Sequence, residues 1–179
     1  MLTIVASATS FSQTQTKENI PGSKSKAVEF MSADGTFLVK EFYDIQKIKG
    51  VECQALIMKN VVSGKKLGCL RLETQYHSQY SDDSYIGTLD ADELDACTQS
   101  LEYIKNTLLP SVPAVYTEAE YKTNDGVKFG AYWSKGKWTA YVYTKGYTSR
   151  SAVFLDVESI DSFISVMQQA KELITNQTK

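Results

Sequence analysis

The sequence has very few of the residues that build metal centres and histidine-dependent active sites. Its 179 residues include one histidine, His77, and three cysteines, with no CxxC or HxxxH spacing. Structural zinc needs four nitrogen or sulfur ligands at short spacings. The G-x-S-x-G, P-loop and G-x-G-x-x-G motifs are also missing. We therefore expect no metal, no cofactor and no catalytic residue, and we predict that the protein is not an enzyme.

Proline, arginine and net charge are scarce as well. With 3 prolines and 42% hydrophobic residues, the chain is expected to form a packed core. The net charge of −2 gives no general attraction to nucleic acid or anionic membranes. No stretch approaches the roughly 20 apolar residues of a membrane span. We expect a folded chain without a membrane span.

The three cysteines are predicted to be unpaired. Cys97 lies on the apolar face of a predicted helix, where a small buried hydrophobic residue is expected. Cys53 and Cys69 fall on successive predicted strands. If Ser63 and Gly64 form the turn between these strands, Cys53 lies opposite Thr74 and away from Cys69, which disfavours a disulfide.

Two helical stretches repeat one pattern at a constant offset of 66 residues. They run from Leu89 to Leu108 and from Leu155 to Ile174. Steps of three and four residues place five apolar side chains of each on one helical stripe, which must be buried. These residues are Leu94, Cys97, Leu101, Ile104 and Leu108 in the first stretch, and Ile160, Phe163, Met167, Ala170 and Ile174 in the second. Asp90 and Glu93 resemble a capping box at the start of the first helix.

Strand-like segments precede each helix. The first half has Thr36–Ile45, Val51–Val62, Leu67–Gln75 and Tyr85–Leu89, with an extra strand at Ala27–Met31 before a hairpin turn at Asp34-Gly35 and a polar loop from His77 to Asp83. The second half has Val115–Lys122, Val127–Trp133, Lys137–Thr144 and Ser151–Leu155. We predict an α+β fold in which a four-stranded antiparallel sheet followed by a helix occurs twice, related by a pseudo-two-fold. The halves are residues 27–110 and 111–176, within one compact unit.

The first twelve residues, MLTIVASATSFS, form a short apolar stretch of small residues that ends before Gln13. The ending satisfies the small-x-small rule for cleavage of an export signal, although a basic leading region is missing. We expect residues 1–12 to be a truncated signal peptide, and residues 13–26 to be a linker. An ordinary disordered N-terminus is the alternative, which would leave the protein in the cytoplasm.

One face of the second predicted sheet carries the candidate ligand-binding residues. With Lys135-Gly136 as the turn, Trp133 lies opposite Trp138 on the core face. The opposite face and its surroundings provide tyrosines and cations: Lys128, Tyr132, Tyr141, Tyr143 and Arg150. Aromatic rings interleaved with cations are typical of single-stranded nucleic-acid binding. Tyrosines also suit half-exposed strands, and lysines keep hairpin tips soluble, so both interpretations stay open.

An acidic stretch and His77 are the remaining candidates for chemistry. Seven carboxylates and no basic residue occur between residues 82 and 102: Asp82, Asp83, Asp90, Asp92, Glu93, Asp95 and Glu102. Such carboxylates could bind Ca²⁺ or act as acid and base, but no Ca²⁺-loop spacing is present, and helix capping explains Asp90 to Asp95. His77 lies in a polar loop beside Tyr76 and Tyr80, where solvent exposure is the expected state.

The second half carries a family resemblance. Thr123–Val142, TNDGVKFGAYWSKGKWTAYV, resembles the pattern DDG-x-x-x-G-Y-x-x-x-x-G-x-x-x-W. It departs from this pattern because Ala131 precedes Tyr132 where Gly-Tyr is expected, and because Trp138 lies a little earlier than the pattern's tryptophan. Phe154, Asp156, Glu158 and Phe163 match F-x-D-x-E-x-x-x-x-F. The segment is similar to a family of small, uncharacterised exported proteins of Bacteroidetes-type bacteria, which implies export and no assigned activity. The doubled strand–helix order also resembles the Whirly and transcriptional-coactivator class of single-strand binders.

These observations predict an exported, periplasmic or secreted, non-enzymatic binding or interaction protein of the cell envelope. Its partner would be a protein or a small ligand. The alternative is a single-stranded nucleic-acid binder that uses the aromatic and basic face, and a hydrolase that uses the acidic stretch and His77 is a third candidate. Pairing of an exposed strand edge such as Ala27–Met31 with a second copy would give a homodimer.

Overall fold

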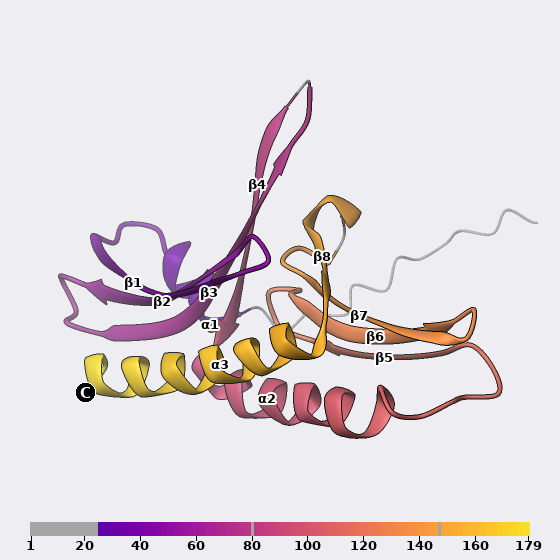
Figure 1. Ribbon diagram of the computed structural model, residues 1–179. Coiled ribbons are helices and arrows are strands. Elements are labelled where there is room, and N and C mark those ends of the chain that lie inside the picture. The colour runs from indigo at the N-terminus through magenta and orange to yellow at the C-terminus, as the bar shows by residue number, and fades with distance from the viewer. Residues whose placement is uncertain (1–24, 80, 147) are drawn as a thin grey trace, which may run out of the picture.

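Two four-stranded antiparallel sheets, each followed by a helix, make up the computed structural model, which describes residues 25–79, 81–146 and 148–179. The first sheet has the order β1-β2-β3-β4, with β1 Leu38–Ile48, β2 Val51–Asn60, β3 Lys66–His77 and β4 Asp82–Asp90. The second has the order β5-β6-β7-β8, with β5 Thr117–Lys122, β6 Lys128–Ser134, β7 Lys137–Tyr143 and β8 Ala152–Leu155. The predicted α+β fold with a doubled sheet-and-helix order is confirmed (Figure 1).

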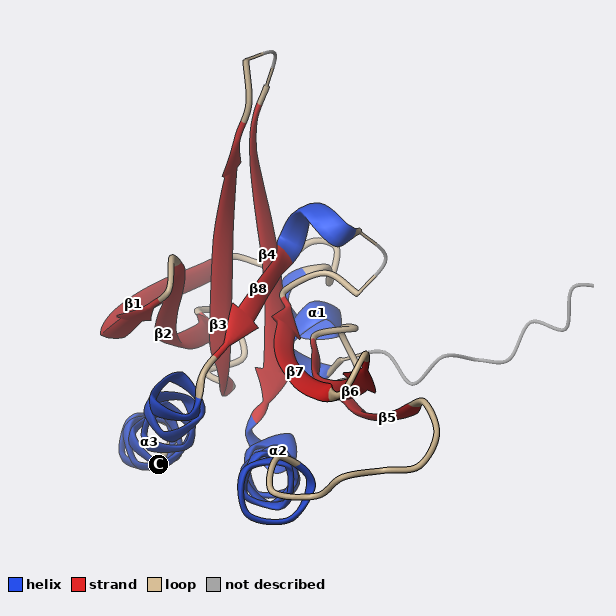
Figure 2. Cartoon of the chain, turned by 45° about the vertical axis from the view of Figure 1, so that its right-hand side comes forward, coloured by secondary structure: helices blue, strands red, loops and turns tan. Residues whose placement is uncertain are grey.

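The two long helices lie side by side beneath the sheets, and each packs on the sheet of the other half (Figures 1 and 2). Helix α3, Val157–Gln177, follows the second sheet but lies across strands β1, β2 and β3 of the first. Helix α2, Leu94–Tyr103, follows the first sheet and continues as the π-helical turn η2, Ile104–Leu108, and both contact β6 of the second. The halves are therefore interlocked.

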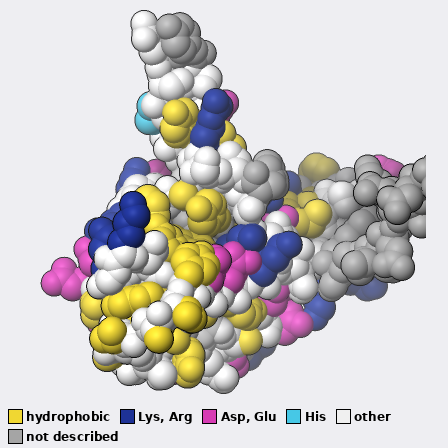
Figure 3. All heavy atoms as spheres, turned by 90° about the vertical axis from the view of Figure 1, so that its right-hand side faces the viewer, with side chains coloured by type: hydrophobic (Ala, Val, Ile, Leu, Met, Phe, Trp, Pro, Cys, Tyr) yellow, Lys and Arg dark blue, Asp and Glu magenta, His cyan; other side chains and the backbone are white. Residues whose placement is uncertain are grey.

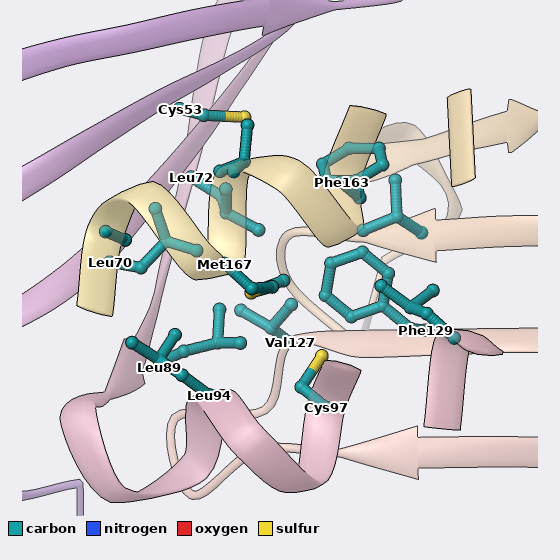
Figure 4. Close-up of a cluster of buried hydrophobic side chains, with 14 of the residues drawn as sticks. Cys53, Leu70, Leu72, Leu89, Leu94, Cys97, Val127, Phe129, Phe163 and Met167 are labelled. Carbon is teal, nitrogen blue, oxygen red and sulfur yellow. The ribbon is translucent and has the colours of Figure 1, made fainter. Parts of the chain in front are cut away.

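Both predicted helical stripes are buried in a single core (Figure 4). Nine of the ten stripe residues are buried, and Leu108 is partly buried against the same cluster. Phe163 of α3 meets Phe129 of β6 edge-on, with ring centroids 5.3 Å apart. Cys97 is fully buried, as predicted. Side chains from both sheets and both helices therefore share this main core.

Both helix starts are fixed by acidic residues, and the sequence predicted this for the first of them. Glu93 Oε2 accepts the backbone N–H of Asp90 at 2.9 Å, in the short 3₁₀ turn η1, Ala91–Glu93, that opens α2. Asp156 is the N-cap of α3, where its Oδ1 accepts the backbone N–H of Ser159 at 2.9 Å. Each carboxylate thus satisfies N–H groups that the first helical turn leaves without partners.

The predicted extra strand at Ala27–Met31 is wrong, because these residues lie in a helix. Helix α1, Lys26–Met31, packs on the face of the first sheet that is opposite α3, against Leu56 and Cys69. The carboxylate of Asp90 accepts hydrogen bonds from Ser25 Oγ and from the backbone N–H groups of Lys26 and Ala27, at 2.8 to 2.9 Å. Consequently no strand edge is available here for a second copy, and Asp34-Gly35 connects α1 to β1 instead of closing a hairpin.

The predicted register between β2 and β3 is wrong by two residues. Cys53 lies opposite Leu72, and Cys69 lies opposite Leu56. The reason is that the turn is longer than two residues. Asn60 Oδ1 accepts hydrogen bonds from the backbone N–H groups of Val62 and Ser63. The backbone N–H of Asn60 donates to the carbonyl of Lys65. Cys53 and Cys69 are free and point to opposite faces of the sheet.

Strands β3 and β4 extend past the rest of the first sheet as an arm (Figures 1 and 2). The polar loop predicted from His77 to Asp83 is shorter than expected, because His77 and Asp82 still pair as strand residues. His77 Nδ1 lies 2.9 Å from Asp82 Oδ1 on this exposed arm.

The predicted signal peptide, residues 1–12, lies outside the described residues, as does most of the predicted linker. The last linker residues, Ser25 and Lys26, cap and begin α1. Among the described residues, no helix is long and apolar enough to cross a membrane.

Candidate ligand-binding site

A polar pocket of about 460 Å³ lies on the outer face of the second sheet. The register of β6 and β7 pairs Trp133 with Trp138 and Ala131 with Ala140, as predicted, and places the alternate residues on the face away from the core. The pocket, called the tyrosine pocket below, is lined by Tyr116, Glu118, Glu120, Lys128, Tyr132, Ser134, Tyr141, Tyr143, Gly146, Thr148 and Ser149.

Four of the five residues predicted to bind a ligand line this pocket, and the fifth does not. Lys128, Tyr132, Tyr141 and Tyr143 are brought together by the pairing of β6 and β7. Arg150 lies in the 3₁₀ turn η3, Ser149–Ser151, which directs it toward the β3–β4 arm. Its guanidinium carbon lies 5.3 Å from the ring centre of Tyr76, and its Nη1 lies 3.4 Å from Asp83 Oδ2.

Two pocket carboxylates, Glu118 and Glu120, were missed by the sequence analysis. They alternate with Thr117, Ala119 and Tyr121 along β5, which pairs with β6. The strict alternation of the segment Thr117–Lys122 was the available signal, because it places both glutamates on the same face of a strand.

Tyr141 is the centre of the pocket's hydrogen-bond network. Its side chain is 3% exposed, and its hydroxyl lies 3.0 Å from Glu118 Oε1 and 3.1 Å from Glu120 Oε2. Burial, together with the hydrogen bond to Glu118 and the charge of Glu120, raises the pKa of the Tyr141 phenol far above its ordinary value. The Tyr116 hydroxyl donates to the other oxygen of Glu118 at 2.9 Å.

The tyrosine rings are fixed relative to one another. The ring of Tyr141 lies over Gly130, where a Cβ would be 2.5 Å from the Tyr141 hydroxyl oxygen, so residue 130 must be glycine for this ring position. Tyr143 meets Tyr141 edge-on with centroids 5.1 Å apart, and Tyr132 lies 6.2 Å from Tyr141 on its other side. Tyr132 and Tyr143 are only half-buried, so part of each ring faces the pocket.

Two lysines near this face have carboxylate partners, whereas Lys122 and Lys137, on the same outer face, have no ion pair among the described residues. Lys128 Nζ lies 2.9 Å from Glu120 Oε1, and Lys145 Nζ lies 3.0 Å from Asp125 Oδ2. Figure 3 shows acidic and basic side chains next to each other at the second-sheet end of the molecule. Phosphate groups would therefore have to compete with protein carboxylates for Lys128 and Lys145, which does not favour a nucleic-acid platform at the pocket itself.

Six of the seven residues of the acidic stretch have contacts within the fold. Their partners are His77 for Asp82, Arg150 for Asp83, the N-terminus of α1 for Asp90, Lys26 for Asp92, the backbone N–H groups of Asp90 and Asn124 for Glu93, and Lys171 for Asp95. Among the described residues, no group of three or more His, Cys, Asp or Glu side chains is placed to hold a metal ion. These contacts give six of the seven carboxylates a structural role in the fold.

Comparisons of the chain with protein-family models, with curated proteins and with solved structures gave no match.

Proposed function

We propose that the protein is a non-enzymatic binding protein that holds a small ligand in the tyrosine pocket. The observation that carries this proposal is the fixed arrangement of Tyr141, which is held by two carboxylates below two partly open tyrosine rings. Ligand sites of this kind combine aromatic surface with a few placed polar groups, within volumes of roughly 300–1,000 Å³. The tyrosine pocket, at about 460 Å³, falls in that range.

The lining of the pocket supports binding without chemistry. It contains no histidine and no cysteine among its residues. Its most buried titratable group, Tyr141, is held in the protonated form by the raised pKa of its phenol. A group that keeps its proton so firmly is a poor general base and a poor nucleophile near neutral pH.

Native mass spectrometry of protein purified from its own cells tests the proposal. The wild-type chain should retain a small ligand, and the Tyr143→Ala variant should lose it, because that change removes one wall of the pocket. Tyr103→Ala is the matched control, since Tyr103 is 56% exposed on α2 and does not line the tyrosine pocket. Equal retention by all three proteins would overturn the assignment of the site.

We further propose that the protein acts in the cell envelope after export. The support is the small-residue ending of residues 1–12 and the resemblance of the second half to exported proteins. The intact mass of the chain in the periplasmic or secreted fraction tests this. A chain that begins at Gln13 is expected, and an uncleaved chain in the cytoplasm would contradict export.

Single-stranded nucleic acid is the second candidate ligand. Its support is the set of tyrosine rings on the sheet face together with Arg150 stacked near Tyr76 on the arm. Binding of an oligonucleotide that weakens steeply with salt, and that is lost in Tyr132→Ala, would favour it.

A further inference from the structure

The tyrosine pocket contains one carboxylate more than it has cations. Its charged lining residues are Glu118, Glu120 and Lys128. Lys128 is committed to Glu120 at 2.9 Å. Within the described part of the chain, Glu118 has no ion-pair partner, and its two oxygens accept only tyrosine hydroxyls. The residues that line the pocket therefore carry a net charge of −1.

The pocket also lacks one hydrogen-bond donor. The Tyr141 hydroxyl has a single proton but lies within hydrogen-bond distance of two carboxylates, at 3.0 Å and 3.1 Å. It can donate fully to only one of them. The carboxylate that does not receive this proton faces the lone pairs of the phenol oxygen, and the two oxygens repel each other. An additional hydrogen-bond donor placed between them would remove this repulsion. Glu118 and Glu120 thus offer acceptor capacity that the protein itself does not fill.

The walls of the pocket suit a positive charge. The rings of Tyr132 and Tyr143 line it with their half-buried faces. Aromatic faces attract cations, and more strongly where water is partly excluded. An ammonium group bound to a carboxylate and flanked by such rings gains both a charge-assisted hydrogen bond and this attraction.

We infer that the tyrosine pocket binds an organic monocation through an N–H-bearing ammonium group, which pairs with Glu118 between the rings of Tyr132 and Tyr143. This inference rests on the proposed function and specifies the ligand class. One positive charge neutralises the pocket, and the ammonium N–H supplies the missing donor. The remaining volume accommodates the organic part of a small amine.

Three probes with the same skeleton but different charge test the inference: phenethylammonium, phenethyl alcohol and 3-phenylpropanoate. Each is titrated into the full-length protein, and binding is followed by NMR shifts of the pocket residues. We expect the ammonium to bind at least about tenfold more tightly than the alcohol, and the carboxylate to bind more weakly than both. Glu118→Gln should reduce the preference for the ammonium over the alcohol to within about threefold.

Glu41→Gln is the matched control. Glu41 on β1 also accepts a tyrosine hydroxyl two residues away, from Tyr43 at 3.1 Å, but it lies on the first sheet and away from the pocket. This variant should keep the wild-type preference. A preference lost equally in both variants would overturn the role of Glu118.

The outcomes separate this inference from the proposal on which it rests. If all three probes bind the pocket with similar affinity, the ammonium specificity is wrong, while a ligand-binding pocket stands. If N,N,N-trimethylphenethylammonium binds as tightly as phenethylammonium, N–H donation is wrong. If no probe shifts the pocket residues and no ligand is retained on purification, both the inference and the proposed function are wrong.

Discussion

Gly87 on β4 lies directly against the backbone carbonyl of Thr144, which follows β7 in the other half of the chain. A Cβ on residue 87 would be 2.2 Å from that carbonyl oxygen and 2.4 Å from Val127 Cγ2. Beside this contact, the hydroxyls of Thr74 and Thr144 are 2.7 Å apart and buried. The two sheets approach so closely here that residue 87 has no room for a side chain.

The first prediction is that Gly87→Ala strongly destabilises the fold. The added methyl group has to displace backbone, which should lower the free energy of unfolding by about 2–3 kcal/mol. Chemical denaturation followed by circular dichroism measures the change. Gly35→Ala is the comparison: a Cβ there meets open space, but the φ of +69° is unfavourable, so a loss of about 1 kcal/mol is expected. Equal losses would show that the close approach at Gly87 is relaxed at little cost.

The second prediction concerns Asp156 and acid stability. The ion pair with Lys49, at 2.7 Å, and the hydrogen bonds from Ser159 hold the pKa of the Asp156 carboxyl well below its ordinary range. A depressed pKa contributes stability that is present above the unfolded-state value of about 4 and is lost as the pH falls below it.

At pH 7 the melting temperature should therefore decrease from wild type to Asp156→Asn, which keeps a capping oxygen but loses the ion pair, and further to Asp156→Ala, which loses both. The difference between wild type and Asp156→Asn should narrow between about pH 4 and pH 2. A difference that does not change over this range would argue against the ion pair.

The third prediction concerns Tyr121 and alkaline stability. Its hydroxyl donates to the backbone carbonyl of Glu93 at 3.2 Å, and burial, with smaller electrostatic contributions, raises its pKa to about 12. A raised pKa contributes stability that is present below the unfolded-state value of about 10 and is lost as the pH rises toward 12.

Between pH 10 and pH 12 the wild-type free energy of unfolding should fall more steeply than that of Tyr121→Phe, by up to about 1.4 kcal/mol per pH unit. Denaturant titrations at several pH values in this interval provide the measurement. Parallel curves would show that the phenol already ionises in the folded protein.

The fourth prediction is that the native protein does not react with thiol reagents. Cys53, Cys69 and Cys97 are at most 2% exposed, and burial raises the pKa of the Cys53 and Cys69 thiols to about 12. The thiolate is the reactive form of cysteine. The rate at which Ellman's reagent labels the folded protein should therefore equal the rate at which local unfolding exposes these cysteines. In denaturant, all three free cysteines should react at once. Rapid labelling of the native protein would contradict the burial of these residues.

The parts of the fold that were predictable from the sequence depend on short-range patterns. The stripe from Leu94 to Leu108 follows helical periodicity, and the register of β6 and β7 follows from the two-residue turn at Lys135-Gly136. Both can be derived within about twenty residues of sequence. For the same reason, four of the tyrosine-pocket residues were correctly placed on one face.

The errors arise where distant or side-chain contacts decide the structure. Helix α1 begins at the N-cap Ser25 and is held by hydrogen bonds to Asp90, more than sixty residues away, so nothing within Ala27–Met31 distinguishes it from a strand. The register of β2 and β3 depends on the Asn60 side chain, which lengthens the turn. Arg150 was grouped with the pocket because of its position in the sequence, but η3 directs it to the arm. Glu118 lies on the predicted strand Val115–Lys122, whose outward-facing glutamates were not included among the candidates.

The exchange of helices between the halves has a consequence for synthesis on the ribosome. Strands β1 to β4 leave the ribosome first, but the helix that covers their inner face, α3, is the last element and ends at Gln177. At roughly 5–20 residues per second, the apolar face with Leu70 and Leu72 stays uncovered for on the order of ten seconds. The nascent chain should therefore need a chaperone that binds exposed sheet surface until α3 has been synthesised.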